Sequence, residues 1–147
     1  MTAPRTGGSD FVARVEDGVG AIAAADWDRC AGTSNPFLSH AFLSALEVSA
    51  SVGSGTGWQS APICIDDADG TLAGIIPAYL KSHSQGEYVF DHGWADAWHR
   101  AGGRYYPKLQ IAVPFTPVPG PRLLSRDPDV LPKLIAAAEA LTEQNGL

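Results

Sequence analysis

The sequence has few cysteines, few basic residues and no long apolar run, and each shortage excludes a class of protein. Two cysteines, Cys30 and Cys64, are too few for a disulfide framework, so both are expected to be reduced thiols. Lys and Arg number 10 against 16 Asp and Glu, and the net charge of −6 argues against a nucleic-acid-binding surface. No segment approaches the roughly 18 apolar residues of a membrane span, and the N-terminus lacks the apolar stretch of a signal peptide. We therefore expect a cytoplasmic protein without a DNA partner.

The composition is that of a globular chain. Hydrophobic residues make up 45% of the 147 residues and charged residues 18%, which suits one domain with a buried core. Residues 1–10 are small and polar and are expected to be disordered. The domain is expected to occupy residues 11–147.

Apolar periodicity and turn residues predict alternating strands and helices. Asn35-Pro36 marks a helix start, because Asn caps free amides and Pro lacks one. The apolar run 72–80 predicts a strand buried on both faces, with a bulge or an edge position at Pro77. Strands are expected over 11–16, 61–65, 72–80 and 108–114, and helices over 21–30, 36–46 and 129–144, with a turn or short helix over 91–100.

The segment from Lys81 to Lys108 has the composition of a ligand cleft. It contains three of the four histidines, every tyrosine except Tyr79, and two tryptophans, interleaved without a clean period. Core strands do not need this mixture, whereas a cleft needs a few convergent polar groups on an aromatic wall. Candidate proton acceptors are His83, Glu87, Asp91 and His92, candidate proton donors are Tyr88, Tyr105 and Tyr106, and candidate anion-binding residues are Lys81, Arg104, Lys108 and Arg122.

Other chemistries have weaker support in the sequence. His92, Asp96 and His99 would share one face of a helix and offer metal ligands, but Gly93 makes a regular helix doubtful, so no metal is expected. Cys64 lies in an apolar strand and is expected to be buried and inert. Neither GxGxxG nor GxxxxGK[ST] is present to cradle a phosphate.

Three strings carry a resemblance to a known family: NPFLSHAFLSALE, YLKSHSQGEYVFDHGWADA and GGRYYPKLQIAVPFTPVPGPRLL. Together they resemble the bacterial FemAB-like predicted N-acyltransferases, relatives of the peptidoglycan-interbridge aminoacyltransferases within the GNAT superfamily. The similarity runs from about Phe11 to the end of the chain.

The resemblance implies an α+β fold of GNAT type, with a mixed, mostly antiparallel central sheet flanked by helices. It also implies that the chain is the N-terminal, acceptor-side half of a tandem-domain protein, ending before the last strands of its own domain. An open sheet edge would then favour self-association. The acyl donor, acyl-CoA or aminoacyl-tRNA, would be bound by the second GNAT-like domain, since the usual coenzyme A loop is replaced here by VPGPRLLSRDPDV.

Three functions remain open on the sequence. The first is an N-acyltransferase acting on a small-molecule or peptide amine, the second is a non-catalytic module that binds such a ligand, and the third is a structural interaction domain. In the first, Asp91 or His92 would accept the amine proton. The cleft is expected to be lined by Lys81, His83, Tyr88, Asp91, His92, Tyr105, Tyr106, Lys108, Thr116 and Arg122.

Overall fold

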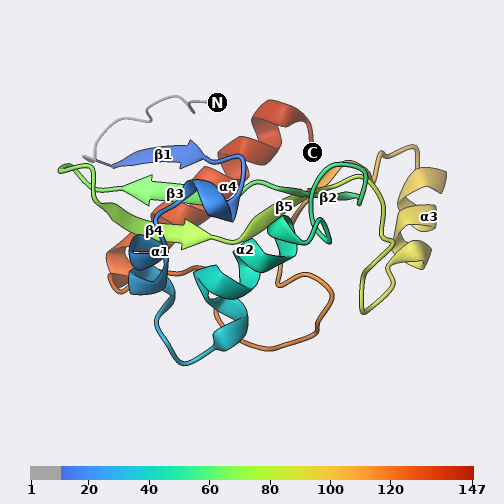
Figure 1. Cartoon of the computed structure of the whole chain (residues 1–147). Helices are drawn as coiled ribbons and strands as arrows, with labels where there is room; N and C mark the ends of the chain where they lie inside the picture. The colour runs from blue at the N-terminus through green and yellow to red at the C-terminus, as the bar shows by residue number, and fades with distance from the viewer. Residues whose placement is uncertain (1–10) are drawn as a thin grey trace.

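A long antiparallel hairpin forms the centre of the fold in the computed structural model, which describes residues 11–147 (Figure 1). Its first arm holds β2 (Trp58–Ser60) and β3 (Ile63–Asp66), and its second arm holds β4 (Leu72–Ile76) and β5 (Ala78–Lys81). β1 (Val12–Val15) pairs antiparallel with β3, and β6 (Lys108–Ile111) pairs antiparallel with β5. The result is two three-stranded sheets, of order β1-β3-β4 and β2-β5-β6. The segment 1–10, expected to be disordered, lies outside the described residues.

The strand pairing keeps the same register from one sheet to the other, although two prolines divide each arm of the hairpin into two strands. Ile63 pairs with Ile76 on one side of the junction, and on the other side the N–H of Ala61 donates to the carbonyl of Ala78 at 2.9 Å. Pro62 therefore lies opposite Pro77. Because proline has no N–H, neither residue can donate to a neighbouring strand. The strand predicted over 72–80 consequently divides at Pro77, and the expected central sheet is two short sheets on one hairpin.

Helices cover both faces of this hairpin. α1 (Ala24–Ala31) and α2 (His40–Val48) lie on one face, and α4 (Leu131–Asn145) lies on the other (Figure 1). Side chains alternate along β3, so that Cys64 packs with the α1–α2 side while Ile63 and Ile65 pack with the α4 side. In β4, Ile75 likewise packs with the α1–α2 side and Ile76 with the α4 side, which confirms the burial on both faces predicted for residues 72–80. The α+β class is as expected and consistent with a GNAT-like fold.

Local capping decides where the helices begin and end. Asn35 accepts a hydrogen bond from the Phe37 N–H, but it starts only a 3₁₀ turn, Pro36–Leu38. Ser39 then caps α2 by accepting from the Phe42 N–H at 3.2 Å, so the helix predicted from Pro36 begins instead at His40. α4 follows another 3₁₀ turn, Pro128–Val130, so it begins at Leu131 rather than at the predicted residue 129, and it ends at Asn145 with Gly146 as its C-cap.

The segment between β5 and β6 contains α3 (His92–Arg100), which stands at one end of the molecule (Figure 1). This nine-residue helix forms despite Gly93, and none of its residues is buried. β6 (Lys108–Ile111) is shorter than the strand expected over 108–114, because the chain leaves the sheet after Ile111 and buries Val113 in the core. The arrangement leaves the polar segment from Ser82 to Pro107 at the open end of the second sheet.

Candidate functional site

The pairing of β5 with β6 brings two lysines together at the end of the second sheet. In this register Lys81, the last residue of β5, lies opposite Lys108, the first residue of β6. Like charges that face each other across a sheet destabilise it unless they are compensated. Two carboxylates from the connecting segment, Glu87 and Asp91, provide that compensation.

Lys81 is fully buried, with 0% of its surface exposed. Its Nζ lies 3.7 Å from the centroid of the Trp58 ring and 3.6 Å from Oε1 of Glu87, and it donates to the Gln85 carbonyl over a long 3.4 Å. Burial lowers the pKa of Lys81, while the nearby Glu87 carboxylate opposes that change. The site therefore holds a cation whose contacts are an aromatic face and a carboxylate rather than water.

Asp91 is the centre of a second set of contacts. Its Oδ2 forms an ion pair with Lys108 and accepts a hydrogen bond from the Tyr105 hydroxyl at 2.7 Å. Burial opposes ionisation of Asp91, but the ion pair with Lys108, the nearby Ser84 hydroxyl and the hydrogen bond from Tyr105 outweigh it and hold the pKa of Asp91 well below its usual range. Burial likewise opposes the charge on Lys108, and the bond to Asp91 outweighs it, so the pKa of Lys108 is raised.

Glu87 and Gln110 form the wall of a hollow of about 210 Å³ beside the lysines. Gln110 stands two residues after Lys108 on β6, and its Nε2 donates to Oε2 of Glu87 at 2.8 Å. Phe115 contributes an aromatic wall. Its φ of 65° is uncommon for a bulky residue and places its ring 5.4 Å from that of Trp58. The remaining lining residues are Tyr88, Val89, Ala112, Val113, Thr116 and Pro117.

Several buried polar atoms of this region have no hydrogen-bond partner. They include three acceptor oxygens, Oε1 of Glu87, Oδ1 of Asp91 and Oε1 of Gln110. An unpaired buried polar atom costs about 1–3 kcal/mol, so such atoms need an explanation. All three are acceptors that N–H donors could satisfy, whereas the Nε1–H of Trp58, in the same region, is a buried donor that also has no partner.

The expected site residues divide into those that meet and those that do not. Lys81, Asp91, Tyr105 and Lys108 lie in the contacts described above, and the Tyr106 hydroxyl joins them by a hydrogen bond to Ser84. Tyr88 and Thr116 line the adjoining hollow. The set drawn together from the expected residues is Lys81, Tyr88, Asp91, Tyr105, Tyr106, Lys108 and Thr116.

Three expected residues lie apart from this set. The His83 ring packs against Gly57, leaving no room for a Cβ there, and its Nδ1 accepts from the Gln85 N–H. His92 is exposed on α3 and stacks on Phe90, with ring centroids 5.4 Å apart. Arg122 donates to the carbonyl of Val118 at 2.7 Å and so holds its own loop.

Sequence reasoning also missed members of the site. Gln110 and Ser84 were not expected, and Glu87 was expected only as one of several candidate proton acceptors. Strand periodicity could have indicated Gln110, because residues i and i+2 of a strand share a face and Lys108 is an expected site residue. No sequence signal placed the Trp58 ring beneath Lys81, since β2 is only three residues long.

Among residues 11–147, no group of three or more His, Cys, Asp and Glu side chains could hold a metal ion. Both cysteines are free and buried, as expected for Cys64, and burial raises the pKa of the Cys64 thiol to about 11. No helix in the described part of the chain is long and apolar enough to cross a membrane.

The structure thus defines an α+β domain with a buried network of charges beside a hollow of about 210 Å³. A family model matches residues 18–147, and the chain belongs to that family, the FemAB-like proteins of peptidoglycan biosynthesis and recognition. No curated protein and no solved structure matches the chain. The family match covers every residue of the site.

Proposed function

We propose that the chain is the acceptor-binding domain of an N-acyltransferase, which transfers an acyl or aminoacyl group to a primary amine held by Glu87 and Gln110. The observation that carries the proposal is a pair of buried oxygens that accept no hydrogen bond, Glu87 Oε1 and Gln110 Oε1, on residues that line one hollow; the nearest cation to the first is Lys81, 3.6 Å away. An amine supplies the N–H donors that both atoms lack. The FemAB-like membership supports the same reading, since peptidoglycan peptides are a source of amines.

In the proposed reaction the amine nitrogen attacks the acyl carbonyl of the donor. A carbon–nitrogen bond forms, the bond from the carbonyl carbon to its leaving group breaks, and the nitrogen loses one proton. Glu87 accepts that proton at Oε1, while Gln110 holds the other carboxylate oxygen in place. Lys81, 3.6 Å from Oε1, keeps positive charge beside the reacting centre.

Asp91 has a positioning role in this proposal. Its carboxylate is bound to Lys108 and Tyr105 and its pKa is depressed, so it is a weak proton acceptor. His92 points to solvent on α3 and takes no part. The donor, acyl-CoA or aminoacyl-tRNA, is delivered by a second GNAT-like domain, because residues 118–130 here form a loop and a 3₁₀ turn rather than a coenzyme A loop.

The amine site is tested by titrating the chain with Nα-acetyl-L-lysine amide while recording the side-chain amide signals of Gln110 by NMR. The matched control ligand is Nα-acetyl-L-norleucine amide, which has the same carbon chain without the amine. We expect the lysine compound to shift the Gln110 signals and the norleucine compound to leave them unchanged. Glu87→Gln should weaken binding about tenfold or more, whereas Glu143→Gln, exposed on α4, should bind as the wild type does.

Equal binding of the two compounds, or full binding by Glu87→Gln, would overturn the amine site. Transfer is then followed in the whole protein with acyl-CoA and aminoacyl-tRNA as donors. Binding of the lysine compound without transfer from any such donor would refute the enzyme and leave the alternative, a module that binds amines without chemistry.

A further inference from the structure

The indole N–H of Trp58 is a buried hydrogen-bond donor that has no acceptor. Only 1% of the Trp58 surface is exposed, and the Lys81 ammonium lies over the face of its ring. The other buried tryptophan, Trp27, has the usual arrangement, because its N–H donates to the Leu38 carbonyl at 2.8 Å. A buried donor without a partner is uncommon in folded proteins, so the Trp58 N–H needs a physical explanation.

Gly86 and Phe115 cover this donor without pairing with it. A Cβ added to Gly86 would lie 3.2 Å from Nε1 of Trp58 and 3.1 Å from Cε1 of Phe115, so the three residues meet at one point. The ring centroids of Trp58 and Phe115 are 5.4 Å apart. A phenyl ring is only a weak acceptor for an N–H. The contact therefore closes off the donor and leaves it unsatisfied.

The covered donor lies directly behind one wall of the candidate amine site. Phe115 lines the same hollow as Glu87, and Gly86 immediately precedes Glu87 in the chain. The Lys81 ammonium contacts both sides of this wall, since it is 3.7 Å from the centroid of the Trp58 ring and 3.6 Å from Oε1 of Glu87. Displacement of the Phe115 ring would therefore open the hollow to the Trp58 N–H.

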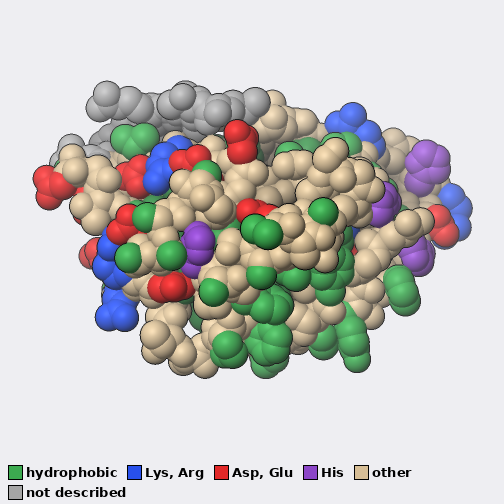
Figure 2. All heavy atoms as spheres, in the orientation of Figure 1, with side chains coloured by type: hydrophobic (Ala, Val, Ile, Leu, Met, Phe, Trp, Pro, Cys, Tyr) green, Lys and Arg blue, Asp and Glu red, His purple; other side chains and the backbone are tan. Residues whose placement is uncertain are grey.

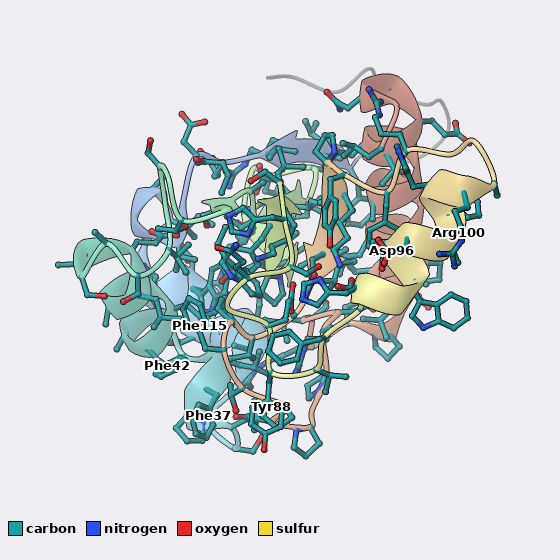
Figure 3. All side chains as sticks on the ribbon, turned by 90° about the vertical axis from the view of Figure 1, so that its right-hand side faces the viewer. Phe37, Phe42, Tyr88, Asp96, Arg100 and Phe115 are labelled. Carbon is teal, nitrogen blue, oxygen red and sulfur yellow. The ribbon has the colours of Figure 1, made fainter. Side chains whose placement is uncertain are left out.

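Phe115 has a conformation that favours such a movement. Its φ of 65° lies in the left-handed region, where a bulky side chain is strained, and it belongs to a loop, residues 112–123, without helix or strand. Hydrophobic side chains gather along the lower edge of the molecule in Figure 2, over this loop, and Phe115 and Phe42 lie toward that edge in Figure 3. A displaced Phe115 ring can therefore rest on other apolar side chains.

We propose that Phe115 moves aside when the ligand binds, and that Trp58 then donates its indole N–H to a carbonyl oxygen of the ligand. The inference rests on the amine site of the proposed function and narrows its substrate to amines that also carry an amide carbonyl. Glu87 binds the amine, and Trp58 binds the carbonyl oxygen a short distance away. A plain alkylamine fills only the first of these two positions.

Nitrogen-15 NMR of the chain tests the two positions separately, because the side-chain amide of Gln110 reports the amine site and the indole N–H of Trp58 reports the carbonyl. The Trp58 signal is assigned through its nuclear Overhauser effects to Phe115 and Tyr79, whose rings lie beside it. The ligands are Nα-acetyl-L-lysine amide and n-pentylamine, which has the same amine and carbon chain without the amide groups. We expect both to shift the Gln110 signals.

Only the lysine compound should move the Trp58 indole signal downfield, and it should bind about tenfold more tightly than n-pentylamine, as one added hydrogen bond allows. Phe115→Ala should speed exchange of the Trp58 indole proton with water about tenfold. It should also raise the preference for the lysine compound about threefold, because the ring no longer has to be displaced. Phe37→Ala is the matched control, since Phe37 is also 38% exposed but contacts Phe42 instead.

The possible failures are distinguishable. A shift of the Gln110 signals without movement of the Trp58 signal would overturn this inference and leave the amine site intact. Equal movement of the Trp58 signal by both ligands would also overturn it, because n-pentylamine has no carbonyl. An unchanged exchange rate in Phe115→Ala would show that Phe115 does not cover the donor. No shift of either signal would refute the proposed function together with this inference.

Discussion

The ammonium group of Lys81 lies 3.7 Å from the centre of the Trp58 ring, and both side chains are enclosed at the end of the central hairpin. The two residues come from paired strands, since Trp58 in β2 is the register partner of Lys81 in β5. Glu87, on the loop that follows, supplies the opposing charge at 3.6 Å. A buried cation is thus shared between an aromatic ring on the sheet and a carboxylate at the candidate amine site.

Replacement of Lys81 by methionine should destabilise the fold by about 3 kcal/mol, because it leaves the buried carboxylate of Glu87 without its cation. Urea unfolding of Lys81→Met, Glu87→Gln and the double variant measures the coupling between the two residues. We expect the double variant to recover more than half of the loss. A coupling free energy near zero would show that the two charges do not depend on each other.

The carboxylate of Asp91 should make stability depend on acid pH. Its pKa is lower in the folded than in the unfolded state, so its contribution is fully present above the unfolded value of about 3.9 and is lost as the pH falls below that value. Between pH 6 and pH 3 the wild type should lose about 1–2 kcal/mol more than Asp91→Asn does. Thermal or urea unfolding across this range measures the difference.

Asp96→Asn is the control for that experiment, because Asp96 is exposed on α3 and makes no ion pair that the structure describes. Its stability should follow the wild-type curve at every pH. If Asp91→Asn also follows the wild-type curve, the contacts of Asp91 with Lys108 and Tyr105 do not persist in solution.

Two glycines should respond in opposite directions to an added methyl group. A Cβ on Gly74 in β4 would lie 2.7 Å from Cγ1 of Val130, the N-cap of α4, and 3.1 Å from Cδ1 of Leu134 in α4, both of which are buried. Gly74→Ala should therefore cost about 1–3 kcal/mol. Gly93→Ala meets nothing within 4 Å in α3 and should stabilise by about 0.5 kcal/mol. Equal unfolding midpoints for the two variants would contradict the packing of α4 on β4.

The sequence predicted the elements whose ends carry their own chemical signals. α4 has an apolar stripe and a terminal Gly146, and Gly32 ends α1 with a φ of 72°. The start of α2 was placed too early because Asn35-Pro36 is a genuine cap, but one for a 3₁₀ turn. β2 was missed because three residues after a glycine-rich run are too few to show a period.

The candidate site was predicted as a region rather than as a geometry. Composition selected residues 81–108, and seven of the ten expected residues do lie at the network or its hollow. Which of these residues meet depends on the pairing register of β5 and β6, which places Lys81 opposite Lys108. Neither strand's sequence alone predicts that register. Arg122, a reasonable anion ligand by residue type, instead donates hydrogen bonds to carbonyls of its own loop, and residue type alone does not indicate this.

The core and the candidate site lie on the same two arms of the central hairpin, whose pairing register is unchanged across Pro62 and Pro77. Ile63 and Ile76, in the centre of the core, belong to the same two arms as Trp58 and Lys81. Amide exchange at Lys81 should therefore slow to the rate set by opening of the core strands, rather than to that of a surface loop. The charges of the candidate site are therefore held in place for as long as the core of the domain stays folded.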